Sequence, residues 1–533
     1  MAANIVPQKV EDVDTQALSP MMQQYLEIKR QHPNEILFYR VGDFYEMFFD
    51  DALTASRELE LTLTGKACGL PDRAPMCGVP FHSYEIYAAR LIAKGYKVAI
   101  CEQMEDPALA KGLVKRDIIR VITPGTVIES SMLADDKNNY ICSIYTRKVR
   151  SRWKTGICFA DISTGEAYAT ELTAEKMGPA IITELCRYMP SEILINPALL
   201  DLKEVTNYVR QHTHALVELR EDACYQQRVM EDAMTAQFGA DWRNTCGFAQ
   251  DGLVPYAFGA LLGYLHETQK HGIDRIKSVQ NYADAQYMRL SPVTRANLEL
   301  TETMRGREKR GTLLWVLDKT ETSMGKRQLR AWIEQPLVDS SVINQRLDAV
   351  EALYNANVTR ADLKEALSHV YDIERLTTRI LYGSATPKEV KALGDTCVYL
   401  PQVRQLARQC TTPLLQELSG AVDPLEDLLD LINRALVEDP PANLKDGGAI
   451  RAGFNAEVDE LRDIMHGGKG FLSQLEAKLK EETGIPKLKI GFNKVFGYYI
   501  EVSRSYAASV PDTFIRKQTL TTGAVSYTHL TLP

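Results

Sequence analysis

The hydrophobic pattern of this chain changes its period along its length, and this change limits the folds that are open to it. Up to about residue 275, short strand-like runs alternate with amphipathic helical segments. From 276 to 448 apolar residues recur almost throughout at helical spacing, and two alternating segments return near 487–503. Strands alternate every two residues and helices about every 3.6, so one sheet or one bundle cannot accommodate the whole pattern. Because 533 residues also exceed one ordinary core, we predict a multidomain fold that combines α/β domains with an all-α region.

Turn residues and changes of pattern place the predicted domain boundaries. Residues 1–124 are predicted to be mixed α/β and to end at the turn Thr123-Pro124-Gly125-Thr126. Residues 125–275 begin with strands and continue with alternating helices and strands, which favours a sheet with flanking helices. Residues 276–448 are predicted to form a helical scaffold, and 449–511 a charged helical stretch followed by a β-hairpin. In the first domain we expect strands at 35–40 and 97–103 and helices at 21–31, 50–59 and 84–94.

The composition is typical of a soluble globular protein, with 45% hydrophobic and 25% charged residues. The formal charge of −8 argues against a uniformly basic nucleic-acid-binding surface, but it is compatible with local basic patches. The start of the chain does not resemble a signal peptide, and the apolar stretch at 254–265 is too short to span a bilayer. We therefore expect a cytoplasmic protein without a membrane segment. The ten cysteines contain no C-x-x-C pair, which favours buried, reduced thiols over a zinc site or disulfides.

The segment Gly42–Asp51 carries the most distinctive candidate site. It is predicted to run from a strand into a helix, with an aromatic residue, Phe44, two positions before a carboxylate, Glu46. In an extended strand these two side chains project to one side, while Tyr45 points to the other. An apolar ring beside a hydrogen-bond acceptor could enter a base stack and contact the neighbouring base. The alternative is that Phe44 is a core aromatic and Glu46 an ordinary exposed carboxylate.

A second candidate site is a basic hairpin late in the chain. Between 486 and 520, only Glu501 and Asp512 oppose six basic residues, which are Lys487, Lys489, Lys494, Arg504, Arg516 and Lys517. A hairpin tip with Asn493 and Lys494 suits contact with DNA phosphates, which positions a protein without reading sequence. The alternative is a solvated, lysine-rich hairpin without a nucleic-acid partner.

Two other charged segments suggest different chemistry. Asp161 and Glu166 could begin a Mg²⁺-dependent nuclease site, but the later segments supply no clear carboxylate partners, and a turn is the simpler interpretation. The basic segment Lys111–Arg120 could touch phosphates or form the solvated edge of a strand.

The sequence contains no motif that indicates an enzyme. His82 with Cys77 and Glu102 suggests a catalytic triad, but nothing places a nucleophile on an elbow turn, so a structural histidine is favoured. The segment Gly467-Gly468-Lys469-Gly470 lacks the Ser or Thr that follows the lysine of a P-loop, and no P-loop occurs elsewhere. We predict no ATPase, no bound cofactor and no metal site in this chain.

Several motifs occur in a distinctive order: Gly42-Asp43-Phe44-Tyr45-Glu46, Pro75-Met76-Cys77-Gly78-Val79-Pro80, Val98-Ala99-Ile100-Cys101-Glu102-Gln103, Lys111-Gly112, Thr123-Pro124-Gly125-Thr126, Asp372-Ile373-Glu374-Arg375-Leu376 and Gly491-Phe492-Asn493 through Gly497-Tyr498-Tyr499-Ile500. In this combination the chain resembles the MutS family of bacterial DNA mismatch-repair proteins over roughly residues 15–522. The resemblance implies a mismatch-binding domain, an RNase H-like connector without nuclease chemistry, a helical core or lever and a DNA clamp. These correspond to residues 1–124, 125–275, 276–448 and 449–511.

The resemblance also implies roles for the two candidate sites. In the family, the phenylalanine that matches Phe44 stacks on the mispaired base, and the glutamate that matches Glu46 hydrogen-bonds that base. The basic hairpin becomes the clamp on the DNA backbone, through Lys487, Lys489, Asn493 and Lys494. The implied partner is duplex DNA with mismatches or small loops, together with a homodimer partner and MutL-like proteins in the full-length family. ATP and Mg²⁺ are expected as cofactors of the full-length protein only.

The end of the chain departs from the family pattern. Residues 512–522 match the start of a returning lever, after which the match stops. We expect residues 523–533 to be a non-native tail on a C-terminally truncated fragment, with a genuine short strand as the alternative. Two other functions stay open: a Mg²⁺-dependent nuclease on the connector, and a family branch that binds DNA junctions. The presence of Phe44 and Glu46 argues against the second.

Overall fold

The computed structural model describes residues 17–105, 112–150, 152–270, 275–282, 286–466, 468–493, 497–503, 505–506, 510–511, 514–519 and 523–527. Contacts divide the chain into two compact units, residues 1–430 and 431–533. Among the predicted site residues, Lys494 lies outside the described residues, as does Lys111 of the basic segment.

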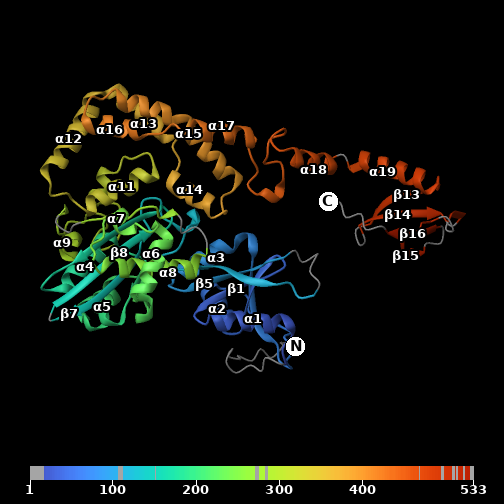
Figure 1. The fold of residues 1–533 in the computed structure, drawn as a ribbon, viewed down its shortest axis with the longest axis horizontal. Coiled ribbons are helices and arrows are strands. Elements are labelled where there is room, and N and C mark those ends of the chain that lie inside the picture. Colours follow the sequence, from blue (N-terminus) through green and yellow to red (C-terminus); the bar gives the residue numbers. More distant parts are fainter. Residues whose placement is uncertain are drawn as a thin grey trace. The chain divides into compact units, whose positions relative to one another are not determined.

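The first unit begins with a six-stranded sheet, part of which Figure 1 shows in blue around β1 and β5. Its strand order is β3-β4-β2-β1-β5-β6. Its strands are β1 Glu35–Val41, β2 Phe44–Phe48, β3 Thr64–Lys66, β4 Ala74–Pro80, β5 Lys97–Gln103 and β6 Arg116–Ile122. Strand β2 is antiparallel to both of its neighbours, β1 and β4, whereas β1 and β5 are parallel. The mixed sheet confirms the predicted α/β class of the N-terminal part, and the strands predicted at 35–40 and 97–103 are present.

Helices cover both faces of this sheet. Helix α1 (Pro20–Gln31) packs on one face, in a core that includes Phe48. Helices α2 (Phe49–Leu59) and α3 (Tyr84–Ala93) pack on the other face, in a core that includes Tyr45 and Met47. The two cores form because alternate residues of each strand point to opposite faces. All three helices were predicted, and β2 runs directly into α2 as expected.

A second six-stranded sheet has the order β11-β10-β7-β8-β9-β12. Its strands are β7 Ile141–Val149, β8 Arg152–Asp161, β9 Glu166–Leu172, β10 Glu192–Ile195, β11 Leu216–Leu219 and β12 Gln280–Asn281. Strands β7, β8 and β9 are antiparallel, and β10 and β11 then add in parallel beside β7. Three antiparallel strands followed by parallel strands agree with the predicted RNase H-like connector.

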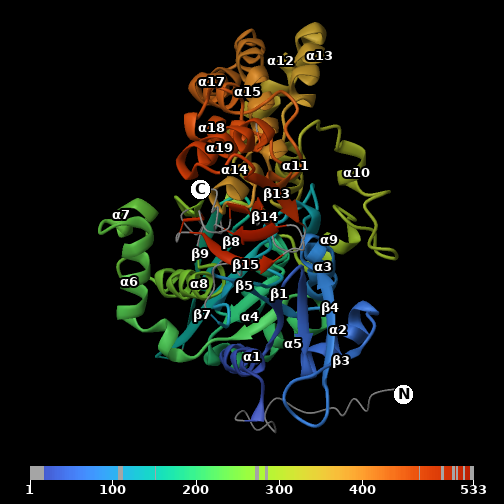
Figure 2. The same ribbon diagram turned by 90° about the vertical axis from the view of Figure 1, so that its right-hand side faces the viewer.

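The connector sheet is also covered on both faces. One face packs against α4 (Met177–Tyr188) and α5 (Lys203–His212). The other packs against α6 (Gln227–Phe238), α7 (Trp242–Cys246) and α8 (Val254–Gln269), which Figure 2 shows together in green. The apolar stretch of α8 is therefore the buried centre of this core.

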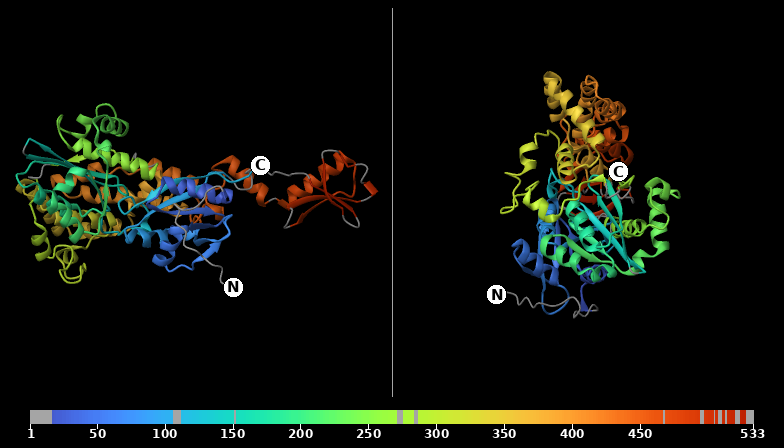
Figure 3. Two further views of the ribbon diagram at one scale, coloured as in Figure 1. Left: turned by 90° about the horizontal axis from the view of Figure 1, so that it is seen from below. Right: turned by 90° about the vertical axis from the view of Figure 1, so that its left-hand side faces the viewer.

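Residues 292–435 are mainly helical, as predicted for most of the 276–448 region, and these helices are coloured yellow to orange in Figure 3. They are α9 Pro292–Asn297, α10 Leu313–Leu317, α11 Ser323–Glu334, α12 Ser340–Asn355, α13 Asn357–Ser368, α14 Ile373–Leu381, α15 Pro387–Arg408, α16 Pro413–Ala421 and α17 Glu426–Ala435. Helix α15 begins with a capping box in which Thr386 and Glu389 satisfy each other's backbone N–H groups.

The second unit contains α18 (Ala456–His466), α19 (Gly468–Thr483) and a four-stranded antiparallel sheet in the order β13-β14-β16-β15. The predicted hairpin is present as β13 (Lys489–Asn493) and β14 (Gly497–Ser503). Where the structure describes the last two segments, Ile515–Thr519 forms β15 and Gly523–Tyr527 forms β16. Both segments are therefore extended there, while the non-native origin of 523–533 stays a prediction.

All ten cysteines lie in the described part of the chain, where they are free. Nine are buried and Cys224 is half-buried, which confirms the predicted buried thiols. None of the helices that the structure describes has the length and apolar character needed to cross a bilayer.

Candidate nucleic-acid interface

Phe44 stands at the exposed start of β2, beside a two-residue turn from β1. The residue is 48% exposed, whereas Tyr45, Met47 and Phe48 are buried. Gly42, at the first turn position, has a φ of 57°, a conformation that glycine adopts without steric cost. A large exposed aromatic ring at the tip of a short, rigid hairpin is unusual for a core residue, so the structure does not support the burial alternative for Phe44.

The exposure of Phe44 follows from how far α1 extends over the sheet. Phe44, Glu46 and Phe48 alternate along β2 and share the face on which α1 packs. The α1 core encloses Phe48, Glu46 is half-buried, and Phe44 is exposed. The predicted projection of Phe44 and Glu46 to one side, with Tyr45 on the other, is therefore confirmed.

A polar network on the opposite face anchors this hairpin. The Tyr45 hydroxyl donates to the Glu102 carboxylate, and Arg40 Nη1 donates to the same carboxylate oxygen at 3.2 Å. The Arg40 guanidinium lies 3.7 Å from the centre of the Phe81 ring, and the Phe81 N–H donates to the Asp43 carbonyl at 3.0 Å. These contacts hold the Gly42–Asp43 turn in place from the face opposite Phe44. The backbone that carries the Phe44 ring is therefore preorganised.

The Glu46 carboxylate is not free in the structure. It forms an ion pair with Lys66 of β3, and only 15% of the Glu46 side chain and 27% of the Lys66 side chain are exposed. Sequence reasoning missed this partner because Lys66 lies on a different strand, 20 residues later. No local spacing signals such a contact, since β3 and β2 meet only through β4, which pairs with both.

The basic hairpin of the second unit has a smaller excess of positive charge around it than its sequence suggests. Lys487 and Lys489 are exposed, but Lys489 lies opposite Glu501 on β14. Glu476 of α19 accepts a hydrogen bond from the Ile490 N–H at 3.2 Å, and its pKa is lowered by Lys480, that N–H and the charge of Lys489. The fold thus brings an additional carboxylate to Lys489, whereas Lys487 has no such neighbour among the interactions of the described residues.

The carboxylate of Asp161 is fully buried and used for structure. It accepts hydrogen bonds from Asn138 Nδ2 and the Asn139 N–H at 3.0 Å each. Its other oxygen accepts from the Ser163 N–H at 2.9 Å and the Ser163 hydroxyl at 2.7 Å. In the described ranges, no group of three or more His, Cys, Asp and Glu side chains is placed to hold a metal ion. These contacts favour the turn interpretation of Asp161 over the nuclease alternative.

Glu166, which lies opposite Asp161 on the neighbouring strand, has a raised pKa. Burial, followed by the charges of Glu374 and Asp161, raises its pKa from 4.5 to about 7. The folded protein therefore binds this proton more tightly than the unfolded chain, so the associated stability is complete below pH 4.5 and is lost as the pH rises to about 7.

The substitution Glu166→Gln tests this proton linkage. Gln is neutral at every pH and keeps an oxygen for the 3.0 Å hydrogen bond from Asn138. We expect it to raise the free energy of unfolding by about 2 kcal/mol at pH 8 and to change it little at pH 4.5, measured by urea denaturation. An equal effect at both pH values would contradict the shifted pKa.

The triad suggested by His82, Cys77 and Glu102 is not assembled as a catalytic site. Cys77 is buried and its thiol donates to the Ala52 carbonyl at 3.5 Å, while burial raises its pKa to about 12. Glu102 is engaged by Arg40 and Tyr45. These contacts argue against a catalytic triad, while His82 is exposed and its structural role stays a prediction.

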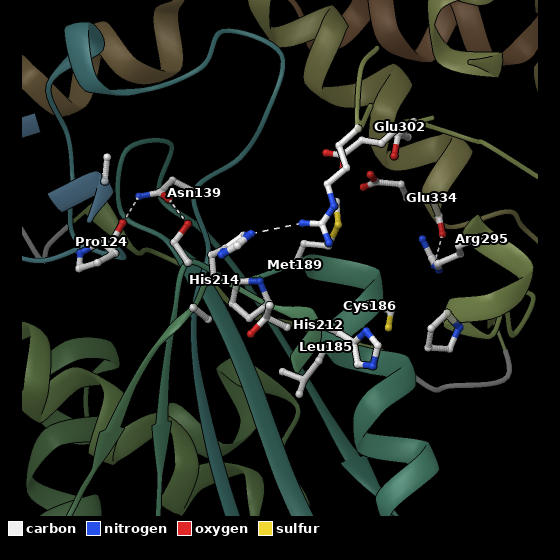
Figure 4. A pocket seen from close by; sticks show the side chains of 18 of the residues that line it. Pro124, Asn139, Leu185, Cys186, Met189, His212, His214, Arg295, Glu302 and Glu334 are labelled. Carbon is white, nitrogen blue, oxygen red and sulfur yellow. Dashed lines mark hydrogen bonds between the residues drawn. The ribbon is translucent and has the colours of Figure 1, made fainter. Parts of the chain in front are cut away.

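A cavity of 820 Å³ lies in the first unit at the meeting point of α3, α4, α5 and α9 (Figure 4). Neither Phe44 nor Glu46 lines it. Its charged groups pair with one another or with neighbours: Glu302 with Lys137 at 3.1 Å, Glu334 with Arg330 at 3.3 Å, and Arg307 with His214 at 3.2 Å. Arg295, which also lines the cavity, donates to the Glu334 carbonyl, and its buried Nε has no hydrogen-bond partner among the described residues.

Three buried arginines hold the loop between the two α/β domains. Arg375 donates to the carbonyls of Ala134 and Lys137 at 2.9 and 2.7 Å, and Arg330 donates to the Asp136 carbonyl at 3.0 Å. Arg327 forms a bidentate pair with Asp372 at 2.6 and 2.8 Å. Arg327 also donates to Glu374 at 2.6 Å. Helices α11 and α14 are therefore joined to each other by ion pairs and to this loop by hydrogen bonds.

The charged residues of the motif Asp372-Ile373-Glu374-Arg375-Leu376 therefore have structural roles in the first unit. Asp372 caps α14 by accepting from the Arg375 N–H, while its carboxylate also binds Arg327. Although burial alone would lower it, hydrogen bonds and charge from Asp372 and Glu374 raise the pKa of Arg327. The motif joins the helical region to the loop between the α/β domains and is distant in sequence from both candidate DNA-contacting segments.

Comparison with known proteins places this arrangement in a class. Residues 19–131 match MutS domain I, residues 139–280 match MutS domain II and residues 293–510 match MutS domain III. The fold is thus the predicted one, a multidomain protein that joins two α/β domains to a helical region.

Curated relatives named DNA mismatch repair protein MutS agree over nearly the whole chain. The relative from Ruminiclostridium cellulolyticum is 47% identical over 503 residues, which cover 94% of this chain and 57% of the relative. The relative from Acetivibrio thermocellus is 48% identical over 504 residues, with 95% and 57% covered. The relative from Clostridium perfringens is 47% identical over 504 residues, with 94% and 54% covered. The chain belongs to the MutS family, and it spans slightly more than half the length of these relatives.

Proposed function

We propose that this chain binds duplex DNA and recognises mismatched or unpaired bases at the start of DNA mismatch repair. Phe44 acts as a wedge that enters the base stack, and Glu46 accepts a hydrogen bond from the displaced base. The observation that carries the proposal is the exposed Phe44 ring on a hairpin whose other aromatic residues are buried. Family membership supports it, since the relatives are DNA mismatch repair proteins.

The physical basis is the weakness of a mismatched step. Inserting a side chain between base pairs costs a few kcal/mol of unstacking, and the cost is lowest where pairing is already faulty. A wedge therefore selects deformable sites without reading a particular sequence. The Glu46 carboxylate adds discrimination, because its repulsion from phosphates, reduced by the ion pair with Lys66, is compensated fully only where a displaced base donates a hydrogen bond to it.

The proposal is tested by the affinity of the 533-residue chain for matched oligonucleotide duplexes. Fluorescence anisotropy would compare a homoduplex with the same duplex carrying a G·T pair or one unpaired T. We expect tighter binding to the two imperfect duplexes, and equal affinity for all three would contradict the proposed recognition. Salt is held constant, because phosphate contacts make every affinity depend on it.

We propose that the basic hairpin contacts the DNA backbone through Lys487, Lys489, Asn493 and Lys494. Lys487→Ala removes a charge that is exposed and lies outside the pairing with Glu501. We expect weaker binding to homoduplex and mismatched DNA alike, and a slope of log K against log salt that falls by about 1.

The matched control for this prediction is Lys478→Ala. Lys478 is exposed in the same unit and lies on α19, 3.8 Å from Glu482. We expect it to leave both affinity and salt slope nearly unchanged. Equal effects of the two substitutions would indicate general electrostatic attraction and would remove the basis for a clamp at this hairpin.

Other expectations from the family resemblance stay predictions. They are ATP and Mg²⁺ as cofactors of the full-length protein, a homodimer, and MutL-like partners.

A further inference from the structure

We propose that Lys66 is a specificity-determining residue that acts through Glu46, an inference that rests on the proposed function. Lys66 holds the Glu46 carboxylate in an ion pair for which a displaced base has to compete. On normal duplex the pair stays closed and neutralises the carboxylate near the phosphates. On a mismatch, a base N–H donates a hydrogen bond to the Glu46 carboxylate in place of Lys66. The released Lys66 ammonium group can then contact a phosphate.

The sheet makes this pair possible across an intervening strand. Lys66 lies opposite Ala74 of β4 and Glu46 lies opposite Gly78, so both face the same side of that strand. Gly78 places no side chain beside Glu46; a Cβ there would make ordinary contact with Glu46 Cγ at 3.7 Å and a tight contact with the Tyr45 carbonyl at 3.2 Å. The lysine can therefore extend along β4 and reach the carboxylate.

The surroundings hold the ammonium group in place without burying it completely. Lys66 Nζ lies 5.5 Å from the centre of the Phe48 ring, which is fully buried beneath α1. A cation above an aromatic face is attracted to it, so Lys66 has a second favourable contact beside Glu46. The remaining exposure of both side chains leaves the pair accessible to a ligand in contact with the Phe44 surface.

The charges explain why the pair affects discrimination rather than affinity alone. A bare carboxylate at a DNA surface is repelled by phosphates on any duplex, and a base donor compensates this repulsion only at a mismatch. Without Lys66, the penalty on normal duplex therefore rises more than the penalty on mismatched duplex. Without Glu46, Lys66 becomes an ordinary phosphate-attracting cation that favours both duplexes equally.

A double-mutant cycle measures this coupling by the ratio of homoduplex to mismatch dissociation constants. We expect Lys66→Met to weaken homoduplex binding more than mismatch binding and so to raise the ratio about fivefold. Glu46→Gln should lower the ratio, and adding Lys66→Met to it should leave the lowered ratio unchanged. Lys66→Arg, which keeps the charge, should preserve the wild-type ratio.

Lys94→Met is the control, because Lys94 pairs with Glu58 at 2.9 Å elsewhere in the same domain and should not alter the ratio. If Glu46→Gln changes the ratio but Lys66→Met does not, the inference is overturned and the proposed role of Glu46 stands. The inference also fails, with the role of Glu46 intact, if Lys66→Met raises the ratio equally with and without Glu46. An unchanged ratio in Glu46→Gln overturns both the role of Glu46 and the inference.

Discussion

Phe44→Ala should abolish the preference for mismatched DNA while leaving homoduplex affinity nearly unchanged. Stacking of a base on an aromatic side chain contributes about 1–3 kcal/mol, so mismatch affinity should fall by about tenfold or more. Homoduplex binding depends on phosphate contacts, which the Phe44 ring does not make. The measurement is the anisotropy comparison of homoduplex with G·T and unpaired-T duplexes at fixed salt.

Because Phe44 is already 48% exposed, its removal should cost little stability, so a loss of discrimination can be assigned to the site itself. Phe454→Ala is the matched control, since Phe454 is 41% exposed in the second unit and lies outside the candidate site. The control should retain the preference for mismatches. Discrimination by Phe44→Ala equal to that of the unmodified chain would refute the wedge.

Arg327→Leu should cause the largest loss of stability among the substitutions considered. The Arg327 side chain is 3% exposed and pairs with Asp372 and Glu374. Its removal leaves Glu374 without this cation and Asp372 with only the more distant Arg375 at 4.0 Å, and breaking a buried ion pair in this way costs about 3–5 kcal/mol. We expect a lower urea midpoint for the first unit, followed by circular dichroism.

Two further variants separate pairing geometry from charge. Arg327→Lys keeps the charge but cannot form the planar bidentate pair, so it should also destabilise the protein, although less than Leu. Arg228→Met removes an arginine whose side chain is 92% exposed and 3.8 Å from Asp232, and it should change stability by less than about 0.5 kcal/mol. Equal midpoints for Arg327→Leu and Arg228→Met would show that the buried network does not support the fold.

Much of the architecture was predictable because it depends on local periodicity. The N-terminal strands and helices, the helical region and the hairpin all follow from apolar spacing and turn residues. The period-two alternation of a strand was also enough to place Phe44 and Glu46 on one side of β2. Periodicity could not show how far α1 covers that side, and this coverage decides that Phe48 is buried while Phe44 is exposed.

The partners of charged residues were not predictable, because they come from strands and helices far apart in sequence. Lys66 meets Glu46 across β4, and Glu476 approaches Lys489 from α19. Asp161 was considered as a metal ligand from its sequence, but its oxygens are occupied by Asn138, Asn139 and Ser163. Hydrogen-bond acceptors have the same sequence signal whether a metal, a base or the protein itself satisfies them.

The sequence by itself determined the class of the domains, their order and the aromatic–carboxylate pair at Phe44 and Glu46, because periodicity and motif order are properties of the chain. The tertiary structure alone decided that the aromatic ring is exposed and the carboxylate is held by Lys66. Exposure and ion pairing depend on which distant segments pack together, and that is settled by burial of apolar surface over the whole sheet.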